Sequence, residues 1–187
     1  MAGEMLQIRW HGRGGQGAVT SAELLAKAAI AEGKWAHAFP SFGPERRGAP
    51  VLAFTRISSG EPIRIRAEIT QPNVVVVLDP GLLGIVNVAA GLREGGVVII
   101  NSTKTPEHIR EEFKISAPLA VVDATRIARE LLGQPITNTT MVGALVMATG
   151  VVKLESLLEP LRDRFGKIAE KNIAAMRRAY DETALKE

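Results

Sequence analysis

The chain has 187 residues, a net charge of +3, 46% hydrophobic residues and no cysteine. This length and apolar content fit one well-packed domain, which we expect to span residues 1–187. The absence of cysteine excludes disulfides, thiolate catalysis and an iron–sulfur cluster held by cysteines of this chain. We see no signal peptide and no apolar stretch long enough to span a bilayer, so we expect a cytoplasmic protein. Basic residues are interleaved with acidic ones, which does not favour nucleic-acid binding.

The first third of the chain begins with a strand-like run at Leu6–Trp10, followed by apolar residues at helical spacing over Ala18–Glu32. The segment Ala38–Val51 contains three prolines and two glycines and predicts a loop. Two alternating runs, 51–57 and 63–69, flank a short turn and predict an antiparallel hairpin.

The rest of the chain alternates between apolar runs and helix-like segments. Three continuously apolar runs predict strands covered on both faces, at 73–79, 95–101 and 118–124. Helices are expected over 82–93, 107–113 and 124–132, and from Thr139 onward in three pieces broken at Gly150 and Gly166. This order predicts a single three-layer α/β/α domain with a mixed, mostly parallel sheet and a helical C-terminal tail.

Between the first strand and the first helix lies "WHGRGGQGAVTSAELL", in which Gly12, Gly14 and Gly17 form a G-x-G-x-x-G pattern. Glycines permit a tight turn and a close backbone approach to an anion, and the N-terminus of the following helix favours a phosphate. The pattern alone fits a tight turn, a dinucleotide site, or a site for another phosphorylated ligand or a partner's cofactor.

A nicotinamide dinucleotide site needs an acidic residue at the end of the second strand to hold the ribose. The corresponding stretch, "WAHAFPSF", has none. Arg46 and Arg47, between Pro44 and Pro50, suit capture of a phosphate or carboxylate, including the 2′-phosphate of NADP; they also fit surface arginines or a salt bridge to a partner chain.

Other polar residues have a structural as well as a functional interpretation. Asp79 and Asp123 each end a predicted buried strand, where α/β proteins place ligand groups and also helix caps. His11 fits a structural histidine better than an acid–base group, and Asn138 a helix cap. No nucleophile, carboxylate pair or metal-ligand pattern is present, so we predict no catalytic residue and no metal site in this chain.

Two long motifs, "RWHGRGGQGAVTSAELLAKAA" and "AFPSFGPERRGAPVLAFTRI", resemble the gamma subunit of 2-oxoacid:ferredoxin oxidoreductases. The similarity is to the pyruvate and 2-ketoisovalerate branch. It continues through "PNVVVVLDPGLL", "GGVVIINS" and "NTTMVGALVMATG" and so covers nearly the whole chain.

The resemblance implies a non-catalytic subunit of a complex that oxidatively decarboxylates a 2-oxoacid, forms acyl-coenzyme A and reduces ferredoxin. Thiamine diphosphate and [4Fe–4S] clusters are then held by partner chains among the alpha, beta and delta subunits, and this chain alone holds no cofactor. Coenzyme A would be bound by Gly14, Gly15, Gln16, Gly17, Arg46, Arg47 and Asn138. The alternatives are a free NADP-binding protein and a structural subunit whose glycine loop docks a partner chain.

Overall fold

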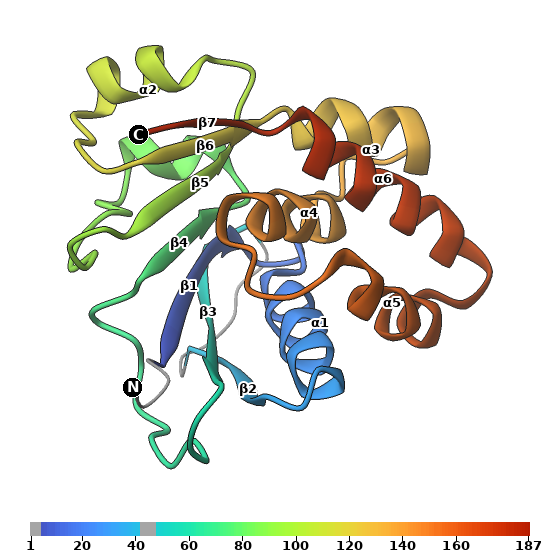
Figure 1. Cartoon of the computed structure of the whole chain (residues 1–187). Coiled ribbons are helices and arrows are strands. Elements are labelled where there is room, and N and C mark those ends of the chain that lie inside the picture. The colour runs from blue at the N-terminus through green and yellow to red at the C-terminus, as the bar shows by residue number, and fades with distance from the viewer. Residues whose placement is uncertain (1–4, 42–47) are drawn as a thin grey trace.

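The computed structural model describes residues 5–41 and 48–187. Its centre is a seven-stranded sheet in the order β2-β3-β1-β4-β5-β6-β7 (Figure 1). The strands are β1 Leu6–Arg13, β2 Trp35–Pro40, β3 Pro50–Ser58, β4 Val74–Val77, β5 Val97–Asn101, β6 Leu119–Val122 and β7 Ala184–Lys186. Strands β1, β4, β5 and β6 pair in parallel, whereas β3 is antiparallel to β1 and β2, and β7 to β6. The sheet is therefore mixed, as predicted, with three parallel pairings at its centre and three antiparallel pairings toward its edges.

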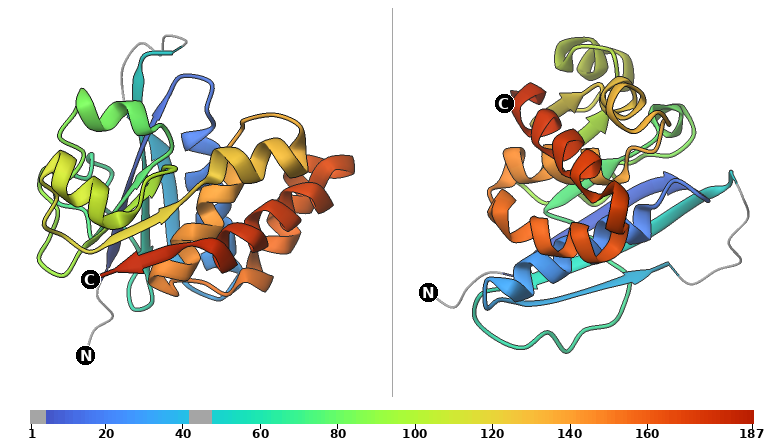
Figure 2. Two further views of the ribbon diagram at one scale, coloured as in Figure 1. Left: turned by 90° about the horizontal axis from the view of Figure 1, so that it is seen from above. Right: turned by 90° about the vertical axis from the view of Figure 1, so that its right-hand side faces the viewer.

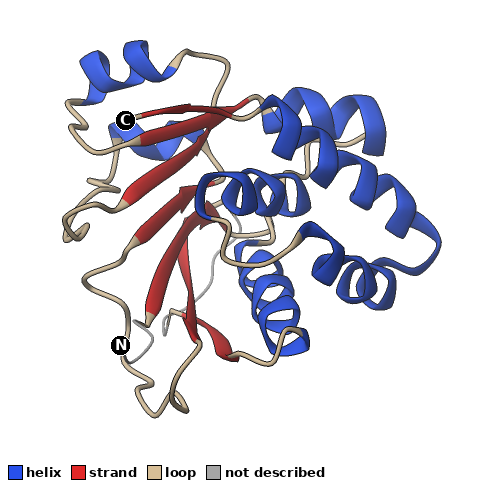
Figure 3. Ribbon diagram, in the orientation of Figure 1, coloured by secondary structure: helices blue, strands red, loops and turns tan. Residues whose placement is uncertain are grey.

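Helices cover both faces of the sheet, which confirms the three-layer architecture (Figures 2 and 3). The α-helices are α1 Ala18–Ala31, α2 Pro106–Phe113, α3 Ala124–Leu132, α4 Asn138–Thr149, α5 Leu158–Phe165 and α6 Ala169–Glu182. Short 3₁₀ helices occupy η1 Pro80–Gly84, η2 Leu154–Leu157 and η3 Gly166–Ile168. Helix α2 and η1 cover one face, and the other helices cover the opposite face. The C-terminal tail is helical and is broken at Gly150 and Gly166, as predicted.

Alternating residues of the central strands supply the two apolar cores. Val74 and Val76 of β4 face the core beneath α1 and α4, whereas Val75 and Val77 face the core beneath η1 and α2. Because both faces are covered, every residue of this strand is apolar and buried, which explains why the strand was recognisable as a continuous run.

The predicted hairpin is wrong in its second strand. Residues 63–69 form no strand, and β3 instead pairs with β1 and β2. The carbonyl groups of this segment accept hydrogen bonds from a side chain of the sheet: the Arg56 guanidinium donates to Ile65 O at 3.2 Å and to Ala67 O at 2.6 Å. These groups are satisfied without a neighbouring strand, so the alternating pattern of the sequence does not produce a ladder.

Two other predicted segments differ from the structure. Residues 82–93 form only the end of η1 and then turns. Gly91 has a φ of 72°, and a side chain there would lie 2.1 Å from Thr70 O, so this turn requires glycine. The predicted loop over 38–51 begins instead as the last part of β2 and ends in β3. In β2, Ala36 and Ala38 pack against the core beneath α1. The short strand β7 was not predicted.

Candidate functional site

The glycine loop, residues 14–17, connects the carboxyl end of β1 to the start of α1. Gly15 and Gly17 have φ values of 91° and 80°, which side-chain-bearing residues rarely adopt. Gly17 is the N-cap of α1, and no side chain of the described residues caps this helix. The first backbone N–H groups of α1 therefore remain available at its positive dipole end, an arrangement that suits an anion.

The glycine loop is joined directly to the connection between β2 and β3, residues 41–49, which we name the basic loop because it contains Arg46 and Arg47. Gly14 N donates to Ala49 O at 2.9 Å, and Gly48 N donates to Gly14 O at 3.3 Å. Arg46 and Arg47 lie outside the described residues. Gly48 and Ala49, which follow them in the sequence, are held against the glycine loop by these two hydrogen bonds.

An ion pair at the end of β4 anchors the glycine loop from the other side. The Asp79 carboxylate accepts from Arg13 Nε at 3.0 Å and from Gln16 Nε2 at 2.9 Å. Gln16 Oε1 in turn accepts from the backbone N–H of Arg13 at 2.7 Å. The amide of Gln16, which the sequence suggested as a ligand contact, is thus engaged at both ends within the protein.

Asn138 is the first residue of α4 and lies against the glycine loop. A Cβ atom at Gly17 would lie 2.6 Å from Asn138 Nδ2, and Ser21 Oγ of α1 donates to Asn138 O at 3.1 Å. The N-termini of α1 and α4 therefore meet here, and both helix dipoles direct positive potential toward the loop. The structure thus brings Asn138 next to Gly17 of the glycine loop.

His11, in β1 just before the glycine loop, is not available for acid–base chemistry on a ligand. It is buried, and its Nε2 accepts from Arg9 Nε at 3.1 Å. Burial, together with the positive charge of Arg9, lowers the pKa of His11 to about 3. The imidazole is therefore neutral at physiological pH and serves as a hydrogen-bond acceptor.

This shift makes stability pH-dependent. An unfolded histidine titrates near pH 6.5, so between about pH 6.5 and pH 3 the unfolded state binds one more proton, and stability falls as pH falls by about 1.4 kcal/mol per unit. We expect wild-type protein to lose about 2 kcal/mol more than His11→Asn between pH 7 and pH 5. Denaturant unfolding at both pH values measures this difference. Equal losses would show that His11 protonates freely in the folded protein.

The sequence did not identify Arg13 as a residue of this network. It also did not reveal a cavity at the carboxyl ends of β4, β5 and β6. This cavity has a volume of about 570 Å³ and is lined by Pro80, Asn101, Ser102, Thr103, Lys104, Asp123, Thr125, Arg126, Arg129 and Glu130. Among the described residues, no cluster of three His, Asp or Glu side chains could hold a metal ion.

None of the described helices is both long and apolar enough to cross a membrane.

Comparison with known proteins places this geometry in a family. Residues 7–182 match the family model described as pyruvate ferredoxin/flavodoxin oxidoreductase. The chain belongs to this family. One curated relative is the pyruvate/ketoisovalerate oxidoreductases common subunit gamma of Thermococcus litoralis, 57% identical over 98% of this chain and 100% of the relative.

Two solved structures share the fold. The pyruvate oxidoreductase subunit PORC of Thermotoga maritima is 38% identical with a TM-score of 0.87, over 98% of this chain and 99% of that one. The 2-oxoglutarate:ferredoxin oxidoreductase of Magnetococcus marinus, solved with 2-oxoglutarate, coenzyme A and succinyl-CoA, has a TM-score of 0.71 at 22% identity. The match covers 95% of this chain and 30% of that chain, so this fold also occurs as part of a longer chain.

Proposed function

We propose that this chain is the gamma subunit of a multi-subunit 2-oxoacid:ferredoxin oxidoreductase that converts a 2-oxoacid such as pyruvate to acyl-coenzyme A. In this proposal the glycine loop and the basic loop together bind the phosphates of coenzyme A. Family membership and the full-length similarity to a curated gamma subunit support the assignment to this class of complex.

The observation that carries the coenzyme A proposal is the hydrogen-bonded junction between the two loops. Coenzyme A carries a diphosphate and a separate 3′-phosphate, so its recognition needs more than one anion-binding element. Backbone N–H groups at the start of α1 suit one phosphate, and the guanidinium groups of Arg46 and Arg47 suit another. The hydrogen bonds of Gly14 with Ala49 and Gly48 support this proposal, because they hold the residues that follow Arg47 against the glycine loop.

The chemistry itself is assigned to other chains. This chain has no cysteine to hold an iron–sulfur cluster. We therefore propose that thiamine diphosphate and the [4Fe–4S] clusters are held by alpha, beta and delta subunits, which pass electrons to ferredoxin in the cytoplasm. This subunit is then non-catalytic and contributes the coenzyme A region and contacts with its partner chains.

Replacing Arg46 or Arg47 with alanine in the assembled complex tests this function. A charge-assisted hydrogen bond contributes about 1.5–3 kcal/mol, so KM for coenzyme A should rise about tenfold or more. The KM for the 2-oxoacid and the decarboxylation half-reaction, which needs no coenzyme A, should be unchanged. Lysine should restore binding only in part, because it lacks the bidentate geometry of arginine.

The matched control is Arg64→Ala, at an exposed arginine elsewhere on the chain, which should leave all kinetics unchanged. If the arginines instead bind a neighbouring subunit, the complex will dissociate and both half-reactions will fall together. An intact complex with unaltered coenzyme A kinetics would refute the proposed role of these residues.

A further inference from the structure

We infer that Asp79 is a positioning residue that holds the glycine loop and residues 48–49 in one arrangement. The inference rests on the proposed function, because it assigns a role in coenzyme A binding to a residue that need not touch coenzyme A. It is carried by hydrogen bonds that connect three segments far apart in the sequence: 13–17, 48–49 and 79–81.

The Asp79 carboxylate uses both of its oxygens inside the protein. Oδ2 accepts from Arg13 Nε at 3.0 Å and from Gln16 Nε2 at 2.9 Å, and Oδ1 accepts from Gly81 N at 2.8 Å. These three donors come from the end of β1, the glycine loop and η1. The carboxylate therefore fixes the loop relative to the carboxyl end of β4.

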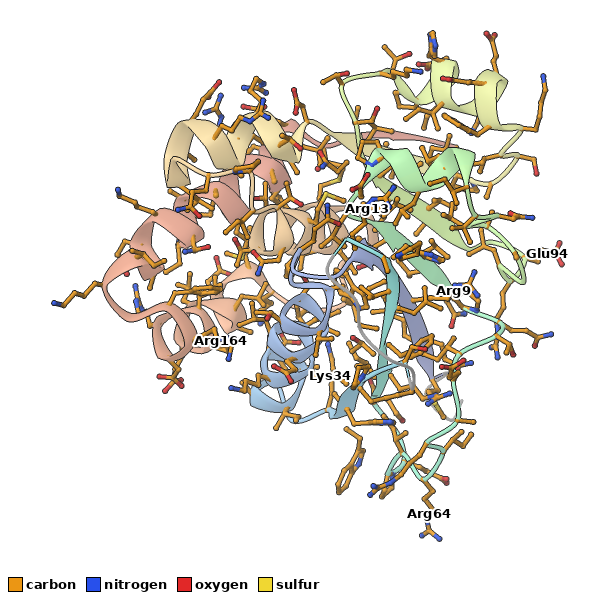
Figure 4. The ribbon with its side chains drawn as sticks, turned by 180° about the vertical axis from the view of Figure 1, so that it is seen from behind. Arg9, Arg13, Lys34, Arg64, Glu94 and Arg164 are labelled. Carbon is orange, nitrogen blue, oxygen red and sulfur yellow. The ribbon has the colours of Figure 1, made fainter. Side chains whose placement is uncertain are left out.

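Arg13 extends this connection to the basic loop. While its Nε donates to Asp79, its Nη1 donates to Gly48 O at 3.1 Å. Arg13 lies between η1 and the start of α1 (Figure 4), from where its guanidinium reaches both Asp79 and Gly48. Fixing the guanidinium of Arg13 on Asp79 thus also fixes the end of the basic loop that follows Arg47.

The charges of this network also favour an anion nearby. A lone carboxylate beside the glycine loop would repel a phosphate, but Asp79 is paired with Arg13, and both side chains are only partly exposed. The pair is neutral overall, so the positive potential at the N-termini of α1 and α4 is left to act on a ligand. Asp79 accordingly supports the site through geometry rather than through its own charge.

The chain offers a matched control in Asp123. Asp123 follows β6 as Asp79 follows β4, and it caps a helix in the same way, with Oδ1 accepting from Arg126 N at 2.9 Å. It has no hydrogen bond to either loop among the described residues. Asp79→Ala and Asp123→Ala therefore both remove a helix cap after a buried strand, and only the first releases the loops.

The first measurement is amide hydrogen exchange on the full-length chain without ligand. Gly14 N and Gly48 N donate across the junction between the loops, so Asp79→Ala should accelerate exchange at both residues by about tenfold or more. Asp123→Ala should leave them unchanged. Asp79→Asn, which keeps one acceptor oxygen, should have an intermediate effect and serves if the alanine variant fails to fold.

The second measurement is steady-state kinetics of the assembled complex. Asp79→Ala should raise KM for coenzyme A about tenfold and leave the coenzyme-A-independent half-reaction intact, with little further effect in a Gln16→Ala background, because residues in one network are not additive. Equal behaviour of the Asp79 and Asp123 variants in both measurements would overturn the positioning role. Faster exchange in Asp79→Ala with unaltered coenzyme A kinetics in Arg46→Ala and Arg47→Ala would confirm that Asp79 holds the loops and refute the proposed ligand.

Discussion

Replacing Arg9 with methionine should lower the free energy of unfolding by about 3 kcal/mol or more, because buried acceptors left without donors cost about 1–3 kcal/mol each. Arg9 is 7% exposed. Its Nη2 donates to Val88 O at 3.0 Å and to Ala90 O at 2.6 Å, and its Nε donates to His11 at 3.1 Å. Methionine retains the apolar stem and removes every donor, so these carbonyl groups lose partners that water cannot easily replace.

Urea unfolding followed by tryptophan fluorescence measures this loss. The matched control is Arg64→Met, because Arg64 is exposed and projects from the body of the molecule (Figure 4). An exposed substitution of this kind should change stability by less than about 0.5 kcal/mol. If the Arg9 variant were as stable as the Arg64 variant, the segment that contains Val88 and Ala90 would not depend on the arginine for its position.

Gly17→Ala should both destabilise the chain and weaken coenzyme A binding in the assembled complex. The φ of 80° costs a residue with a Cβ atom about 1–2 kcal/mol. The new methyl group would also lie 2.6 Å from Asn138 Nδ2, so either Asn138 or the start of α1 must move. Displacing the N-terminus of α1 misaligns the N–H groups that the proposed phosphate site uses, and we expect KM for coenzyme A to rise about tenfold or more.

Gly15→Ala separates the two effects. Gly15 has a φ of 91°, but a Cβ atom there would meet nothing within 4 Å. Both variants therefore carry the backbone cost, and only Gly17→Ala displaces Asn138 or the helix. Thermal unfolding should rank Gly17→Ala as the less stable variant, and coenzyme A kinetics should be more strongly impaired in it. Identical behaviour of the two would show that the contact with Asn138 is unimportant.

Much of the fold was predictable because its signals are local. The continuous apolar run of β4 and the proline at the start of α2, Pro106, are signals that lie within a few residues of the elements they predict. The segment 63–69 was not predictable, because its conformation depends on Arg56, a side chain from another strand. Nothing within an alternating run reveals that a buried guanidinium will bind its carbonyl groups.

The candidate site also has features that local sequence reveals and contacts that it does not reveal. The glycine spacing and the strand-end position of Asp79 are visible in the sequence; the first fits a tight turn or a phosphate site, and the second a ligand group or a helix cap. The bonds from Gly14 to Ala49 and from Arg13 to Asp79 connect residues that only the folded sheet brings together. For the same reason, the amide of Gln16 looked like a ligand contact, whereas the structure engages both of its ends within the protein.

The most direct test of the central claim is an experimental structure of the assembled oxidoreductase with coenzyme A bound. We expect one phosphate of coenzyme A within hydrogen-bonding distance of backbone N–H groups at residues 14–18, and another contacted by Arg46 or Arg47. Asp79 should remain bonded to Arg13 and should not touch the ligand. Coenzyme A held entirely by other chains, with the glycine loop packed against a partner subunit, would contradict the proposal that this chain binds coenzyme A.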